Sequence, residues 1–180
     1  NENGSGIQNI VHDPWRPVPS IGGHLSQNPG IVERAHLDQR PDVATFTTQT
    51  FNEKVLLEGT PSIQLYSNSD KEGFDLCICL SVIRPEQNKV SQLSTGVLRV
   101  IGAKARTPIS REVLLQPIFA EIKSGEQLRI SISGSAWPAI GINPGNGQDL
   151  CGPPSSTSSV ITITIDLSIS SLKILPLIST

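Results

Sequence analysis

The sequence predicts an all-β fold, a sandwich or a barrel of about eight strands with little helix. Runs of strand length, with apolar residues at every second position, recur along the chain. Clusters rich in Gly, Pro, Asn and Asp lie between these runs and are typical of turns. No segment carries a sustained helical stripe of apolar side chains.

The clearest strand signal is residues 161–169, where Ile and Leu alternate with Thr, Asp and Ser. A period of two predicts a strand with one buried face. The same alternation marks residues 127–135 and 74–83. Shorter or less regular strand signals occupy residues 42–51, 54–59, 62–67 and 97–102. Residues 111–122 come nearest to a helical pattern, but Pro117 interrupts them.

The N-terminal third differs from the rest, because it carries much Pro, Gly and Asn and little periodicity. We therefore expect a flexible lead-in over residues 1–11 and a single domain over residues 12–180. The start of that domain, residues 12–53, is expected to be an irregular strap along the sandwich surface. The apolar residues that could pin this strap are Trp15, Val18 and Ile21.

The charge and the cysteines narrow the classes of function. A net charge of −2 and a pI near 5.9 argue against a nucleic-acid partner and against a polybasic membrane contact. No apolar run is long enough to span a bilayer. Cys77 and Cys79 would share one face of a strand, which disfavours a disulfide and points to a reducing compartment, the cytoplasm. Together with Cys151 they lack the spacing of a zinc site, so no metal and no cofactor are expected.

No catalytic group is evident in these residues. The nucleophile-elbow pattern G-x-S-x-G is absent, and the three histidines His12, His24 and His36 lie in the irregular third, where surface positions are expected. The glycine-rich stretch 141–147 lacks a phosphate-loop spacing and is interpreted as a tight loop with positive φ angles. Asp75 is interpreted as a turn cap, and Arg129 as a solvated residue unless Asp75 pairs with it.

Three functions remain open from the residues alone. They are an accessory domain of an enzyme, a carbohydrate- or surface-binding module, and an assembly unit that forms homo-oligomers. Few aromatic residues are present, 4% of the chain, which disfavours a sugar-binding platform.

The segment HDPWRPVPSIGG, residues 12–23, resembles the entry segment of the C-terminal domain in the X-Pro dipeptidyl-peptidase and cocaine esterase (CocE/NonD) family of serine hydrolases. The family pattern there is Tyr-Asp-Pro-x-x-Pro-Val-Pro-x-x-Gly-Gly, and His12 replaces its aromatic residue. The matching positions are Asp13, Pro14, Pro17, Val18, Pro19, Gly22 and Gly23.

Further segments match in the same order, so that the resemblance reaches residue 178. Their matching positions include Arg40, Asp42, Val43, Phe46, Thr48, Gly59, Leu65, Ser69, Asp75, Leu80, Gly96, Arg99, Asn143 and Gly147. The sequence departs from the family in turns and at strand edges, where Glu126 replaces a His and Ser81 replaces an acidic residue.

This resemblance implies a jelly-roll-like, galactose-binding-domain-like β-sandwich of eight or more strands that follows an α/β-hydrolase domain. The catalytic Ser, Asp and His would belong to that preceding domain, in agreement with the missing elbow and the absence of Met. The chain alone would then be inactive. Its partner would be the hydrolase domain of the same polypeptide, and peptide or ester substrate would be reached through that domain.

The resemblance also implies a role for the strap. In the family this domain packs on the catalytic domain and helps to wall the substrate cleft, and the segment after the two glycines is expected to reach that cleft. That segment is His24, Leu25, Ser26 and Gln27. The prolines would give an extended path, Trp15 would anchor it, and Gly22-Gly23 would allow close approach to the neighbouring domain.

Overall fold

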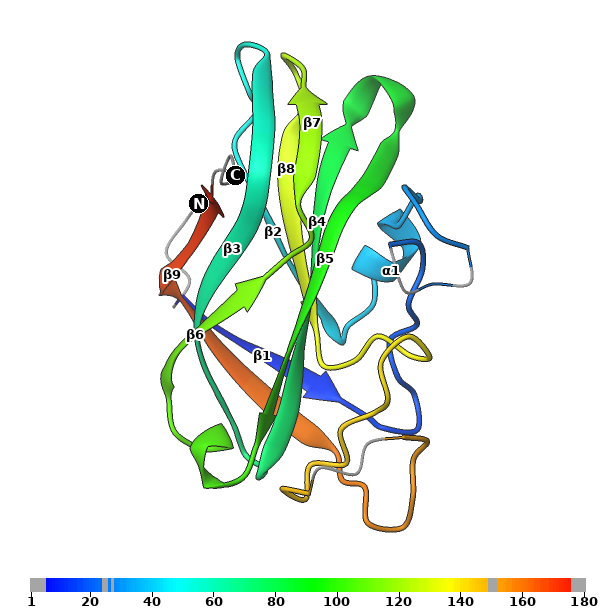
Figure 1. The fold of residues 1–180 in the computed structure, drawn as a ribbon, viewed down its shortest axis with the longest axis vertical. Helices are drawn as coiled ribbons and strands as arrows, with labels where there is room; N and C mark the ends of the chain where they lie inside the picture. Colours follow the sequence, from blue (N-terminus) through cyan, green and yellow to red (C-terminus); the bar gives the residue numbers. More distant parts are fainter. Residues whose placement is uncertain (1–5, 24–25, 27, 149–151, 176–180) are drawn as a thin grey trace, which may run out of the picture.

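The computed structural model describes residues 6–23, 26, 28–148 and 152–175, which form a sandwich of two antiparallel sheets (Figure 1). This confirms the predicted all-β sandwich. One sheet has the strand order β1-β9-β3-β6, with β7 also paired to β3; the other has the order β2-β8-β4-β5.

The elements follow the sequence signals closely. The strands are β1 (Ile7–His12), β2 (Val43–Thr47), β3 (Val55–Ser69), β4 (Gly73–Arg84), β5 (Lys89–Ile101), β6 (Ile109–Leu114), β7 (Ile118–Ile122), β8 (Gln127–Ser133) and β9 (Ile161–Leu175). The helical segments of the described chain are α1 (Ala35–Asp38) and two 3₁₀ turns, Pro85–Gln87 and Ala103–Ala105. Each is a single turn, as the absence of a helical stripe predicts.

The core lies between the two sheets and is built by the alternating positions. Ile161, Ile163 and Ile165 of β9 are fully buried, while the intervening threonines face outward. They pack against the inward side chains of β4, which include Leu76 and Leu80. Apolar burial of this kind is the main favourable contribution to folding.

Two stretches of the chain differ from the sequence prediction. Residues 7–11, assigned to a flexible lead-in, form β1 and pair with β9, because Ile10 fills a core position and gives the segment a buried face. Residues 111–122 are two strands, β6 and β7, separated at Gln116-Pro117. In the predicted strap, residues 43–47 form β2, and the name strap is used below for the irregular residues 13–42.

Strand β4 is buried on both faces, because the strap and the loop after β8 cover its outer side. The outward side chains are Asp75, Cys77, Cys79 and Ser81, and all four residues are buried. The strap runs beside β5 through hydrogen bonds from Gln92 N to Val32 O (2.9 Å) and from Arg34 N to Val90 O (3.0 Å).

The loop after β8 is fixed to this outer face by Asp75. Its carboxylate accepts hydrogen bonds from Arg99 Nε (3.0 Å) and Nη2 (2.7 Å) and from Asn143 Nδ2 (3.0 Å). Asn143 Oδ1 in turn accepts from Gly145 N (3.0 Å). The interpretation of Asp75 as a turn cap, or as the partner of Arg129, is therefore wrong. The register of the β4–β5 ladder places Arg99 directly opposite it.

Of the three glycines in residues 141–147, Gly145 and Gly147 have the positive φ that the sequence predicts, whereas Gly141 does not. Gly145 has a φ of 78° and Gly147 a φ of 75°, both in the left-handed region that favours glycine. In Figure 1 this loop, coloured yellow to gold, runs down the right side of the sandwich to its lower end. It places Asn143 beside Asp75 on the outer face of β4.

Replacing Asp75 by Asn removes the charge that neutralises Arg99 at a site where Asp75 is 1% exposed. Breaking a buried ion pair by changing one partner costs about 3–5 kcal/mol of unfolding free energy, and we expect a loss of this order in urea denaturation. Glu121→Gln is the matched control. Its pair with Lys54 is exposed (3.3 Å), and its loss should cost at most about 1 kcal/mol. Equal losses in the two variants would contradict the anchoring role of Asp75.

Candidate functional site beneath the N-terminal strap

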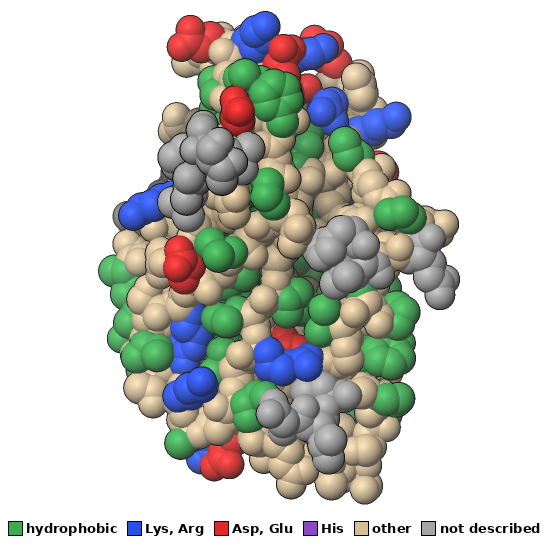
Figure 2. Space-filling view, in the orientation of Figure 1, with side chains coloured by type: hydrophobic (Ala, Val, Ile, Leu, Met, Phe, Trp, Pro, Cys, Tyr) green, Lys and Arg blue, Asp and Glu red, His purple; other side chains and the backbone are tan. Residues whose placement is uncertain are grey.

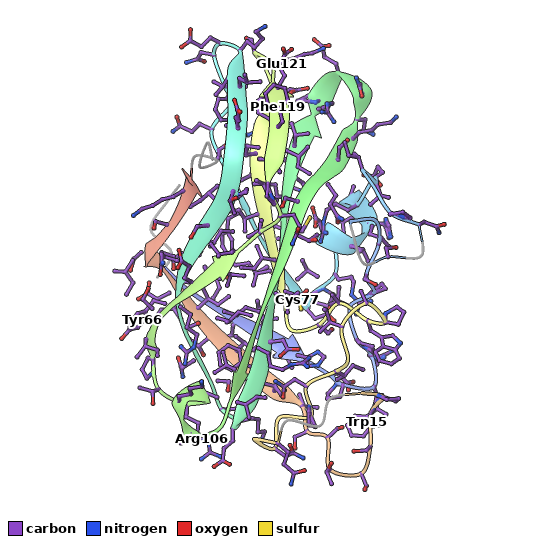
Figure 3. All side chains as sticks on the ribbon, in the orientation of Figure 1. Trp15, Tyr66, Cys77, Arg106, Phe119 and Glu121 are labelled. Atoms are coloured by element: carbon purple, nitrogen blue, oxygen red, sulfur yellow. The ribbon has the colours of Figure 1, made fainter. Side chains whose placement is uncertain are left out.

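A cavity of about 300 Å³ lies between the strap and the outer face of the second sheet. Its floor is β4 and β5, and its walls are the strap segment 18–22 and the loop after β8 (Figure 3, where Cys77 lies beside that loop). The lining side chains that matter below are Ile21, Arg34, Cys77, Gln92, Thr95, Val97, Leu114, Ala139 and Ile140.

Arg34 and Asp38 hold the strap on the sheet at one end of this cavity. The carboxylate of Asp38 accepts hydrogen bonds from Arg34 Nε (2.9 Å) and Ser131 Oγ (2.8 Å), and Arg129 Nη1 lies 3.4 Å from it. Arg129 also donates to Thr47 Oγ1 (3.0 Å). Arg129 is therefore a structural residue, but its carboxylate partner comes from the strap helix and not from β4.

Gln92 joins the same cluster to the strap backbone. Its Oε1 accepts from Arg34 Nη1 (3.0 Å) and from Cys79 Sγ (3.3 Å), while its Nε2 donates to Ile21 O (2.9 Å). All the polar atoms of this buried amide are thereby used. A buried polar network that is fully hydrogen-bonded specifies one arrangement of the segments that it joins.

The two described cysteines are poor nucleophiles. Burial raises the pKa of the Cys79 thiol and raises that of Cys77 well above its usual value, so both stay protonated. Both are free thiols on the same face of β4, as the sequence predicts.

The described histidines do not form a catalytic pair. His36 Nδ1 lies 4.0 Å from Glu33 Oε2, and neither ring nitrogen of His12 has a hydrogen-bond partner in the described part of the chain. Within residues 6–23, 26, 28–148 and 152–175, no group of three His, Cys, Asp or Glu could hold a metal ion. None of the helices in these ranges could cross a membrane.

The segment expected to face the cleft is placed only at Ser26, since His24, Leu25 and Gln27 lie outside the described residues. Ser26 borders the cavity and also a second hollow of about 690 Å³, whose other lining residues include Val32, Glu33 and Pro138. Its Oγ accepts a hydrogen bond from Asn28 N (3.2 Å).

The proline-rich motif organises the start of the strap. Asp13 Oδ1 accepts from Trp15 N (3.0 Å), Pro14 is buried, and Pro17 and Pro19 flank the buried Val18. Pro19 forms a parallel bridge with Trp137 of the loop after β8. Trp15 was expected to anchor the strap, but it is 55% exposed, and the apolar anchor here is Val18.

Gly22 and Gly23 bring two parts of the strap together. Gly22 has a φ of 55°, and a Cβ there would lie 2.5 Å from Val32 Cγ2 and 2.6 Å from Gly30 O. Gly23 exchanges two backbone hydrogen bonds with Gly30, of 2.9 and 3.0 Å. The close approach that Gly22 permits is thus to the chain's own strap.

Gly22→Ala should destabilise the protein by about 1–3 kcal/mol more than Gly125→Ala, because overpacking adds to the cost of a positive φ. Gly125 is the matched control, since its φ is 89° and nothing lies within 4 Å of its Cβ position. Urea denaturation of the two variants measures the difference. Equal destabilisation would mean that the contact with Val32 relaxes without cost.

His12 is buried in β1 and not at the surface as the sequence analysis expected. It is 1% exposed and packs against Gly134, where a Cβ would come within 2.6 Å of the His12 Cβ. Burial lowers the pKa of His12 from 6.5, and the negative charges of Asp75, Asp42 and Asp13 act in the opposite direction. The ring is therefore neutral in the folded protein near pH 7.

This lowered pKa predicts a loss of stability in acid. Below about pH 6.5 the unfolded chain binds a proton at His12 that the folded chain does not bind, so the unfolding free energy falls with pH, by up to about 1.4 kcal/mol per pH unit. His12→Phe removes this contribution, and its unfolding free energy should depend less on pH between 7.5 and 5. His36→Phe, at an exposed position, should keep the pH dependence of the unmodified chain. An unchanged slope in His12→Phe would contradict the assignment.

The polar residues that hold the strap on the sheet were not predicted from the sequence. Arg34 and Asp38 lie in the strap and Gln92 lies on the edge strand β5, and the contacts of Gln92 with Arg34 and of Asp38 with Ser131 join residues remote in sequence. The spacing of Arg34 and Asp38, four residues apart, was the one local signal, because such a pair faces the same side of a helix.

These features define a class of protein: a β-sandwich domain of two antiparallel sheets with a proline-rich strap across the outer face of one of them. The sequence profile of the X-Pro dipeptidyl-peptidase C-terminal non-catalytic domain matches residues 7–166. The chain belongs to this family, which confirms the resemblance seen in the sequence.

Known relatives are much longer than this chain. The cocaine esterase of Rhodococcus sp. (strain MB1 Bresler) is 29% identical over 125 residues, which are 68% of this chain and 20% of that enzyme. The fold is shared with an aminopeptidase of a marine-sediment Thaumarchaeota archaeon (TM-score 0.75, 18% identity, 89% of this chain and 31% of that one). It is also shared with an α-amino acid ester hydrolase (TM-score 0.78, 18% identity, 94% and 32%).

Proposed function

We propose that this chain serves as the non-catalytic C-terminal domain of a serine hydrolase of the CocE/NonD kind. In this proposal it packs on an α/β-hydrolase domain of the same polypeptide, and its strap helps to wall the cleft that takes a peptide or ester substrate. The nucleophilic serine would be supplied by the hydrolase domain. The thiols of Cys77 and Cys79, free and buried, suit a reducing compartment such as the cytoplasm.

The observation that carries this proposal is the family match over residues 7–166, together with the lengths of the relatives. The chain spans a fifth of cocaine esterase and about a third of the two hydrolases with the same fold. The names of all three relatives describe cleavage of esters or peptides. We infer that the catalytic residues of these relatives belong to the part of each chain that this domain does not cover.

The strap supports a role at a domain contact. Trp15 and Ile31 are 55% and 71% exposed, although both are large and apolar. Exposed apolar side chains on an irregular segment gain free energy when another protein surface covers them. By contrast, Figure 2 shows charged side chains gathered at the upper end of the molecule, over the tips of β3, β4, β5 and β7, where contact with water is favoured.

The arrangement of exposed aromatic rings does not favour a carbohydrate-binding module. Trp15 and the 73%-exposed Phe119 are the exposed aromatic side chains of the described residues. Figure 3 places them far apart, Phe119 near the upper end and Trp15 near the lower one. A sugar ring could therefore stack on only one of them at a time.

The isolated 180-residue chain should show no turnover of proline naphthylamide or short ester substrates. In the whole polypeptide, a serine-directed phosphonate should abolish the activity. Replacing residues 24–27 there by Gly-Ser-Gly-Ser should raise KM severalfold, while the same replacement at residues 85–88, the turn between β4 and β5, should leave KM unchanged. Phosphonate-sensitive turnover by the isolated chain, or equal KM values in the two loop variants, would contradict the proposal.

A further inference from the structure

The cavity beneath the strap is lined by residues from both β4 and β5, from Cys77 to Cys79 on β4 and from Gln92 to Val97 on β5. In the β4–β5 ladder Cys77 faces Val97, and Ser81 faces Gln92. The four residue-to-residue steps from Cys77 to Ser81 span about 13 Å at roughly 3.3 Å per step of strand. The two ends of the cavity therefore lie far enough apart to contact different parts of one small molecule.

One end of the cavity is apolar and open. Val97 is 38% exposed and Leu114 is 54% exposed, and both line the cavity together with Ile140. Leu114 comes close to the floor because its carbonyl lies against Gly96, where a Cβ would be only 2.3 Å from the oxygen. A hydrocarbon chain placed here would remove these side chains from water.

The other end is cationic and enclosed. Arg34 is 7% exposed and lines the cavity, and its Nε and Nη1 are used by Asp38 and Gln92. The same guanidinium also hydrogen-bonds the Cys79 side chain, which lies on the floor of the cavity. Arg34 therefore places a cationic group in the wall at this end of the cavity.

The charges of the surrounding cluster do not cancel. Asp38 is shared by two guanidinium groups, those of Arg34 at 2.9 Å and Arg129 at 3.4 Å. One carboxylate thus faces two cations, and an anion that entered the cavity would balance the second. Arginine suits this role because its guanidinium binds carboxylates through strong, charge-assisted hydrogen bonds.

We propose that this cavity is a binding site for a small organic carboxylate with a straight hydrocarbon tail of medium length. The carboxylate accepts a hydrogen bond from the guanidinium of Arg34, and the tail runs along the outer face of β4 and β5 toward Val97 and Leu114. A volume of about 300 Å³ is at the small end of the range for ligand pockets, about 300–1,000 Å³, which excludes larger lipids. This site is a property of the 180 residues and does not depend on the proposed function.

Octanoate is the probe, tested on the full 180-residue chain at pH 7.5. We expect it to raise the temperature of unfolding and to shift the amide resonances of Thr95, Val97 and Ala139 in NMR spectra. Octylamine and 1-octanol, which have the same tail with a cationic and a neutral head, should bind at least tenfold more weakly. Equal binding of 1-octanol would overturn the role of Arg34, and shifts confined to other regions would overturn the site.

Two variants separate the site from general effects on folding. Val97→Glu places a negative charge at the open end and should weaken octanoate binding at least tenfold. Val11→Glu is its control: it makes the same change on β1, at a 51%-exposed position that does not line the cavity, and it should bind as the unmodified chain does.

Arg34→Met removes the cation and should abolish the preference for octanoate over 1-octanol. Because Arg34 also holds Asp38 and Gln92, this variant is informative only if its spectrum shows the native fold. If it does not fold, the comparison of Val97→Glu with Val11→Glu, and of octanoate with octylamine, decides the question. Equal affinity in the two valine variants would refute the proposal.

Discussion

The structure depends on how the chain covers the outer face of its second sheet. That face is polar, with Asp75, Ser81 and Ser131 among its side chains, so an apolar layer could not cover it without leaving hydrogen-bonding groups unpaired. The chain uses two polar attachments instead. Asn143 binds Asp75 near the start of β4, and the cluster of Arg34 and Asp38 binds at the other end. The cavity lies between these attachments.

Much of the sandwich could be predicted because its information is local. The alternation in residues 161–169 and 74–83 reflects a face that must be buried, and any strand in a sandwich shows it. The boundary at Pro117 has a local cause too, and it separates the two strands β6 and β7. The loop glycines Gly145 and Gly147 could also be predicted, because a positive φ favours glycine strongly.

The site could not be predicted in the same way, because its contacts are not local. Gln92 and Arg34 are 58 residues apart, and Ser131 and Asp38 are 93 apart. Nothing in the neighbourhood of either residue indicates its partner. His12 was misplaced for a related reason: its proline-rich surroundings suggested a surface loop, whereas pairing with Ile161 of β9 puts it in the interior. The family resemblance supplied the role of the domain, but the side chains that hold the strap had to be found in three dimensions.

Strand β4 has a neighbour on every side: β5 and β8 along its edges, the core on one face, and the strap with the loop after β8 on the other. Its amide hydrogens can therefore exchange with solvent deuterium only when the whole sandwich opens. Amides of the strap, such as that of Arg34, which donates to Val90 O, can exchange through a smaller, local opening. Exchange at the β4 amides thus reports on global unfolding of the sandwich, whereas exchange at the strap amides reports on local detachment of the strap.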